Sequence, residues 1–144
     1  MRTVQEIYDE AIRLMDAQNE SNGQTNTADN KEYVFRTPDC LNRYINLVYP
    51  YSDTYVARED GKRTVHPKLE AMTDTVDMDD LMCFSVLAPA LVYELLLEEN
   101  PDVASARWKD YESALQMAKN TRPAAVESVD MPYGGLEYGE FSRW

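Results

Sequence analysis

The sequence has few of the side chains on which most enzyme chemistry depends. It contains one histidine, His66, and two cysteines, Cys40 and Cys83, among 144 residues. General-base catalysis needs a partner within reach of the histidine and a third group to orient it. No nucleophile-elbow motif surrounds a candidate serine or cysteine, and His66 stands before Pro67 in a predicted hairpin. We therefore expect His66 to be a surface or turn histidine, and the protein not to be an enzyme.

Metal-binding spacings are missing as well. Neither Cys40 nor Cys83 has a second cysteine or histidine at the spacing of a zinc site, and both lie in stretches predicted to be helical and buried. A reduced, intracellular pair is the simpler interpretation. Four clustered aspartates lack the alternating ligands and the glycine of a calcium loop: Asp74, Asp77, Asp79 and Asp80. We expect these aspartates to cap a helix, and we expect no metal and no other cofactor.

Basic residues are scarce. The chain has 14 lysines and arginines against 26 aspartates and glutamates, for a net charge of −12. Such a surface repels phosphate backbones that come within a Debye length, which argues against tight binding of nucleic acid. The same field suits the wall of a channel past which DNA slides without sticking.

The longest mostly apolar run, Leu81 to Leu97, is short for a membrane span and contains Ser85, Pro89 and Glu94. A span needs about 20 apolar residues and basic anchors, whereas acids flank this run on both sides. We expect a central core helix from about residue 79 to 99, bent or locally broken at Pro89, and no membrane partner. The N-terminus has no apolar region of a secretory signal.

Helical periodicity predicts a mainly α-helical body, a four- to five-helix bundle, over residues 1–120. In residues 3–19, a capping box of Thr3 and Glu6 precedes apolar side chains at helical spacing. The polar stretch from residue 19 to 30 indicates a connecting loop. A chain of this length fits one domain that buries about two-thirds of its unfolded surface.

The second helix has two predicted starting points. Asp29 and Glu32 form one capping box, whereas Thr37 before Pro38 forms another N-cap. The segment is therefore either one helix kinked at Pro38 or a short helix followed by a longer one. Tyr49-Pro50 ends it in both cases.

The last helix is predicted to begin at Asn100-Pro101, an N-cap followed by proline. The tight connection makes it an antiparallel or sharply angled neighbour of the core helix. Its apolar face is formed by Ala104, Trp108, Tyr111, Leu115 and Ala118.

Residues 54–66 are prone to β-structure. Thr54–Ala57 and Arg63–His66 flank Asp60-Gly61, a dipeptide that suits a tight turn. We expect a small β-hairpin that projects from the helical body and leans on it or on a partner. A packed aromatic collar around its base is expected from Tyr49, Tyr51 and Tyr55.

Residues 121–144 show neither helical nor strand periodicity and are predicted to form an extended C-terminal arm. The arm has too little bulk to bury its own aromatic rings, each of which hides about 150–250 Å² when covered. Docking on its own body and docking on a neighbouring molecule are equally compatible with the physics. The predicted partner-binding residues are Tyr133, Leu136, Tyr138, Phe141 and Trp144.

The order of these segments resembles that in small structural proteins of tailed bacteriophages and prophages. The residues that carry the resemblance are Thr3–Ala11, the Leu41-Asn42 helix leading into Tyr49-Pro50-Tyr51, the corner Leu95–Pro101 and the closing Tyr133–Phe141. Among these proteins the sequence is most similar to head–tail connectors or adaptors.

The resemblance implies a small helical bundle with a projecting loop and a terminal arm, set as a ring beneath the portal protein. Its partners would be ring neighbours, the portal protein, tail-side connector proteins and DNA that passes through the lumen without tight binding. The protein would lie at the head–tail junction of the virion, and in the host cytoplasm during assembly. The alternative is a small acidic regulatory module that binds a phage or host protein. A hydrolase is disfavoured by the missing nucleophile–base set.

Overall fold

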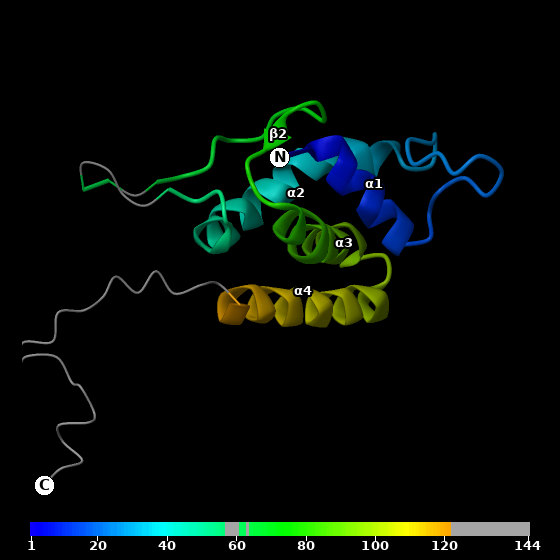
Figure 1. The fold of residues 1–144 in the computed structure, drawn as a ribbon. Coiled ribbons are helices and arrows are strands. Elements are labelled where there is room, and N and C mark those ends of the chain that lie inside the picture. Colours follow the sequence, from blue (N-terminus) through cyan, green and yellow to red (C-terminus); the bar gives the residue numbers. More distant parts are fainter. Residues whose placement is uncertain (57–60, 63, 122–144) are drawn as a thin grey trace, which may run out of the picture.

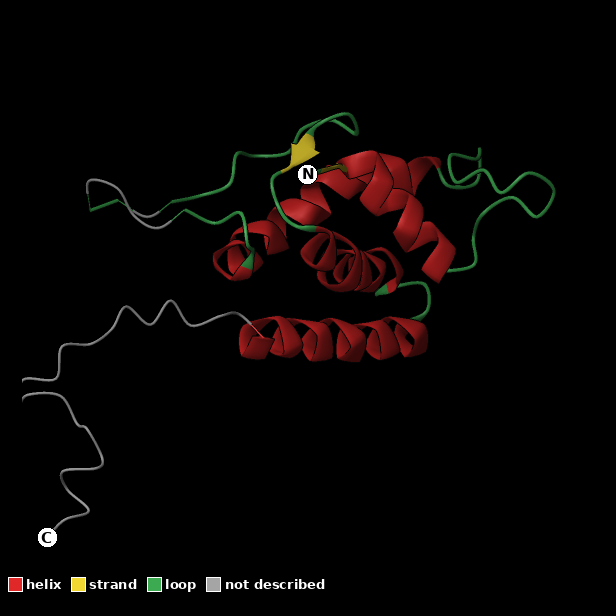
Figure 2. Ribbon diagram, viewed as in Figure 1, coloured by secondary structure: helices red, strands yellow, loops and turns green. Residues whose placement is uncertain are grey.

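The computed structural model describes residues 1–56, 61–62 and 64–121, which form a mainly helical body as predicted (Figure 2). The α-helices of these residues are α1 (Val4–Leu14), α2 (Lys31–Val48), α3 (Ala88–Leu96) and α4 (Pro101–Thr121). The other elements are the strands β1 (Arg2–Thr3) and β2 (Thr75–Val76), the 3₁₀ turn η1 (Tyr49–Tyr51) and the π-helical stretch η2 (Leu81–Leu87).

The core helix lies in the middle of the body, as the sequence predicts. η2 continues directly into α3, with α1 and α2 on one side and α4 on the other (Figure 1). A helix that is apolar around most of its circumference must be covered on several sides. Its fully or almost fully buried side chains include Met82, Cys83, Val86, Leu87, Leu91 and Leu95.

Two contacts show how the helices are oriented. Tyr33, near the start of α2, donates a hydrogen bond to Glu99, just before α4. The Lys119 ammonium, near the end of α4, lies 4.9 Å from the ring centre of Tyr51, just after α2. α2 and α4 therefore run in the same direction, and α3 runs back between them. The predicted antiparallel arrangement of the core helix and the last helix is confirmed.

Helix α1 begins where its capping signal predicts. The Thr3 hydroxyl accepts a hydrogen bond from the Glu6 N–H at 3.2 Å, which satisfies a free donor of the first turn. The helix ends at Leu14, earlier than predicted, because Asp16 takes a left-handed conformation with φ of 53°.

Helix α2 is one helix that passes through Pro38. It begins after Asn30, whose amide donates to the carbonyls of Ala17 and Thr25 at 3.1 and 3.0 Å rather than to its own helix. Neither predicted start is used, although Tyr49 follows the last residue as expected. The Thr37 hydroxyl instead donates to the Tyr33 carbonyl at 2.6 Å inside the helix.

Pro89 coincides with a change in the hydrogen-bond pattern of the core helix. The chain is π-helical up to Leu87 and α-helical from Ala88, with Pro89 in the first turn of α3. Proline has no N–H and its ring excludes the carbonyl four residues earlier, so the ladder cannot continue unchanged. The predicted local break is confirmed.

The small sheet does not lie where the hairpin was predicted. Strand β1 pairs antiparallel with β2, and Arg2 stands opposite Val76. The described residues of 54–66 contain no strand and lead away from the helices as a loop (Figure 1). The remaining residues of the predicted hairpin, 57–60 and 63, lie outside the described part of the chain.

Candidate protein-interaction surface

One end of the body is the departure point of two segments. The loop of residues 52–66 follows η1, and α4 ends at Thr121 at the same end (Figure 1). The contact between Lys119 and Tyr51 joins the two departure points. We call this region, formed by η1, the base of the loop and the last turn of α4, the projecting end.

Side-chain hydrogen bonds anchor the base of the loop to the start of the core helix. Asp79 accepts from the Ser52 hydroxyl at 2.8 Å and from the Asp53 N–H at 3.2 Å. The Thr54 hydroxyl donates to the Asp77 carbonyl at 2.6 Å. These bonds fix the start of the loop beside Asp77 and Asp79, at the beginning of the core helix.

The aromatic collar predicted at this end is confirmed. Tyr49 is buried and meets Tyr55 edge to face, with 5.3 Å between ring centres. Tyr51, half-buried, packs against the core and under Lys119. Burial, with a further contribution from the Asp77 carboxylate, raises the pKa of the Tyr49 hydroxyl. The collar therefore packs the base of the loop against the core.

His66 belongs to this collar, and its predicted surface position is wrong. Its side chain is 4% exposed and its ring stands edge-on to Tyr49 at 5.4 Å. Nε2 lies 2.8 Å from the backbone N–H of Asp77, so it must accept, and Nδ1 then donates to the Pro67 carbonyl at 2.8 Å. Both nitrogens are held by backbone groups, which leaves neither for acid–base chemistry.

The other two clustered aspartates, Asp74 and Asp80, bind loop N–H groups and an arginine; Asp80 stands at the N-cap position of η2, but its side chain makes no capping hydrogen bond. Asp74 accepts from the N–H groups of Glu70 and Ala71 at 2.7 and 2.9 Å, which lowers the pKa of its carboxyl group. Asp80 binds Arg2 at 2.8 Å. Within the described residues, no three histidine, cysteine or acidic side chains are grouped so that they could hold a metal ion.

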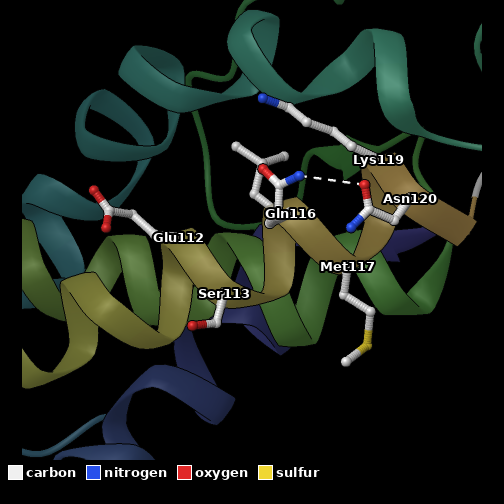
Figure 3. A pocket seen from close by; sticks show the side chains of 7 residues that line it. Glu112, Ser113, Gln116, Met117, Lys119 and Asn120 are labelled. Atoms are coloured by element: carbon white, nitrogen blue, oxygen red, sulfur yellow. Dashed lines mark hydrogen bonds between the residues drawn. The ribbon is translucent and has the colours of Figure 1, made fainter.

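A groove of about 720 Å³ follows the second half of α4 (Figure 3). Glu112 and Lys119 extend from one side of the helix, and Ser113 and Met117 extend from the other. Met117 is 61% exposed. The groove, which we call the α4 groove, is lined by Glu112, Ser113, Leu115, Gln116, Met117, Lys119 and Asn120. This mixture of polar and apolar groups resembles a protein contact surface more than a small-molecule site.

An aromatic cluster fixes α4 in place behind this groove. Trp108 lies 4.7 Å from Tyr93 of α3 and 4.9 Å from Tyr111, measured between ring centres. Tyr111 in turn meets Tyr44 of α2 edge to face at 5.5 Å. The predicted apolar face of α4 is thereby confirmed, and the outer face is left to solvent.

A carboxylate completes this cluster. Glu94 accepts from the Tyr44 hydroxyl and from Arg43, both at 2.6 Å. Burial, followed by the hydrogen bond to Glu94, raises the pKa of Tyr44.

The two free cysteines, Cys40 and Cys83, are also buried, and burial raises the pKa of the Cys83 thiol to about 12.

The predicted partner-binding residues lie outside the described part of the chain: Tyr133, Leu136, Tyr138, Phe141 and Trp144. Docking of this segment on its own body or on a neighbour thus stays a prediction. The structure places Thr121, the residue before 122–144, at the end of α4 and next to Asn120 of the α4 groove. Sequence patterns gave no signal for that groove, since most of its residues are polar side chains typical of the outer face of a helix.

No known protein family, curated protein or solved structure matches this chain. None of the helices in the described ranges is long and apolar enough to cross a bilayer. Function is therefore inferred from the geometry of the described residues.

Proposed function

We propose that this chain is a structural virion protein of a tailed bacteriophage, a head–tail connector or adaptor that forms a ring beneath the portal. The observation that supports this most directly is the projecting end. There, η1 with the base of the following loop and Thr121, the last residue of α4, lie at the same end of the helical body, where Lys119 contacts Tyr51. Such a body could contact its neighbours both through the loop after η1 and through segment 122–144.

A ring requires a heterologous interface, in which one surface of a protomer meets a different surface of the next. Among the described residues the core extends from Val4 to Ala118, and we assign the contact with the next protomer to segment 122–144. Fully extended, 23 residues span about 80 Å, which is ample to reach an adjacent protomer. The proposed contact residues in this segment are Tyr133, Leu136, Tyr138, Phe141 and Trp144.

The net charge of −12 supports a role around DNA rather than on it. Acidic walls keep the phosphate backbone mobile inside a lumen. We place the protein at the head–tail junction, with ring neighbours, the portal protein and tail-side connector proteins as partners. It would be in the host cytoplasm during assembly.

Size measurement tests this proposal. The full chain is examined by sedimentation velocity and electron microscopy, alone and with the portal protein encoded in the same genome. We expect rings or a ring–portal complex. A chain that ends at Thr121 should keep its helical circular dichroism and lose assembly. Normal assembly of the shortened chain would show that segment 122–144 is not the joining element, and a full chain that neither self-associates nor binds the portal would refute the connector role.

The alternative is a small acidic module that binds a regulatory partner. It is supported by a cleft of about 210 Å³ on the outer face of α1, lined by Glu6, Asp9, Glu10, Arg13 and Phe84. This reading predicts a monomer that forms a salt-sensitive one-to-one complex with a basic partner, and no ring.

A further inference from the structure

A second groove lies at the start of α2, away from the projecting end. It has a volume of about 500 Å³. Phe35 is 83% exposed, which makes it the most exposed large apolar side chain of the described residues. We call this site the Phe35 groove, and it is lined by Asn26, Thr27, Ala28, Lys31, Val34 and Phe35.

The Phe35 groove is a surface depression that contains an exposed aromatic ring, whereas an isolated exposed residue has no such depression beside it. Leu47 on the same helix is 63% exposed, yet it is not among the lining residues. Single exposed apolar residues are common on monomers, whereas an apolar hollow that holds an exposed aromatic ring is typical of a docking site. Val34, half-buried, forms part of its wall.

The Phe35 groove and the projecting end lie at opposite ends of α2. Phe35 is in the first turns of the helix, and Tyr51 follows its last turn. At 1.5 Å per residue, the two positions are about 24 Å apart along the axis. The hydrogen bond between Tyr33 and Glu99 places the turn before α4 at the same end as the groove. A donor segment that leaves one end and an acceptor groove at the other are the two halves of a head-to-tail contact.

We infer that the Phe35 groove receives the aromatic part of residues 130–144 from a neighbouring copy of this chain. The inference rests on the proposed ring. In that segment Glu137 and Glu140 stand next to Tyr138 and Phe141 in sequence, so each ring comes with a carboxylate.

The charges at the groove match this occupant. Lys31 is the one charged residue among those that line it, in a chain of net charge −12. Two such copies repel each other, and a lysine that faces Glu137 or Glu140 relieves the repulsion at the contact. Burial of a Tyr138 or Phe141 ring against Phe35 would add apolar contact area to the favourable free energy of binding.

Site-specific crosslinking in the full chain tests the inference. Ala28→Cys, an exposed position of the groove, is mixed with a second copy that carries Ser142→Cys, beside Phe141. The native thiols Cys40 and Cys83 are buried and have raised pKa values, so they should not compete. We expect a disulfide-linked dimer on a non-reducing gel in the mixture, at several times the level of either variant alone.

The matched control replaces Ala28→Cys with Ser113→Cys in the α4 groove. Crosslinking of Ser142→Cys to the Ser113 position in place of Ala28 would put the segment on α4 and overturn the inference. So would a double variant, Ala28→Cys with Ser142→Cys, that closes within one chain at high dilution, because docking would then be in cis.

A pair of substitutions provides an independent readout. Phe35→Ser should weaken self-association at least tenfold in sedimentation equilibrium, whereas Leu47→Ser on the same helix should leave it unchanged. Circular dichroism verifies that both variants are folded. If Phe35→Ser assembles like the unmodified chain, the groove is not the acceptor, while the ring and its portal contact stand. If the unmodified chain does not self-associate, the groove has no second copy to bind and this inference fails, whereas the connector role fails only if the chain also does not bind the portal.

Discussion

His66 illustrates at the scale of one residue how neighbouring backbone groups decide the role of a side chain. A lone histidine before a proline suggested a surface position. The structure instead surrounds it with Tyr49, the Asp77 N–H and the Pro67 carbonyl. Its role is to hold the loop of the projecting end against the start of the core helix.

Replacing His66 with alanine should lower the free energy of unfolding by about 1–3 kcal/mol, because the Asp77 N–H loses its acceptor. Urea denaturation measures the change. Val65→Ala, at a neighbouring position that is 60% exposed, should stay within about 0.5 kcal/mol. Equal effects of the two substitutions would contradict the buried role of His66.

Tyr8 should make stability depend on pH in alkaline solution. Its hydroxyl donates to the Thr25 carbonyl at 2.9 Å, and burial, followed by the Asp9 carboxylate, raises its pKa to about 12. In the unfolded chain the pKa is about 10. The folded state therefore holds the proton more tightly, and this contribution is complete below about pH 10 and is lost as the pH rises toward 12.

We expect the free energy of unfolding to fall between about pH 10 and pH 12, and Tyr8→Phe to make that fall shallower. Urea titrations at several pH values measure both slopes. Tyr33, whose pKa burial and Glu99 also raise to about 12, should account for part of the slope that remains. Identical slopes for Tyr8→Phe and the unmodified chain would refute the assignment.

At the scale of elements, two similar capping signals had different outcomes. Thr3 caps α1 through the Glu6 N–H, whereas Asp29 is bypassed and α2 begins after Asn30. The difference arises because Asn30 is buried and its amide holds the carbonyls of Ala17 and Thr25. Tertiary contacts with the polar loop set the first turn of α2.

Thr3→Ala should therefore cost about 0.5–2 kcal/mol of unfolding free energy, as the loss of an N-cap does. Asp29→Ala, which removes the unused signal, should change it by less than about 0.5 kcal/mol. Thermal and urea unfolding of the two variants check the contrast. A larger loss at Asp29 than at Thr3 would show that the cap of α2 has been misassigned.

Pro38 shows why the outline of α2 could not be derived from its sequence. A proline inside a helix is unfavourable by about 3 kcal/mol relative to alanine. Here the segment buries Thr37, Pro38, Cys40 and Leu41 against the body, and packing outweighs the local preference. Helix propensity includes the local cost of the proline but not the packing of these side chains against other elements.

At the scale of the whole molecule, charge and shape point to the same use. The excess of acidic residues is a property of the entire chain. The arrangement of a projecting end opposite the Phe35 groove appears only once α2, α3 and α4 are packed. Both features support the proposed connector role, in which the protein would join protein neighbours and leave DNA free.

The protein should not retain double-stranded DNA at about 50 mM salt, where electrostatic attraction to phosphates is strongest. Gel mobility shift at micromolar concentrations tests this, with a basic DNA-binding protein of similar size as the positive control. A shift that disappears at higher salt would reveal a basic surface that the net charge conceals, and would argue against a passive lumen wall.

The sequence by itself determined the features that depend on neighbours along the chain. The cap at Thr3, the change at Pro89, the apolar core helix and the antiparallel turn at Asn100-Pro101 follow from side-chain periodicity and local hydrogen bonding. These interactions span a few residues, so a linear pattern contains them.

Only the tertiary structure decided the features that join distant segments. The pairing of β1 with β2, the burial of His66 and the separation of the Phe35 groove from the projecting end depend on contacts between residues far apart in sequence. Such contacts form when helices pack and share a core, and local propensity does not encode the partner that each segment meets.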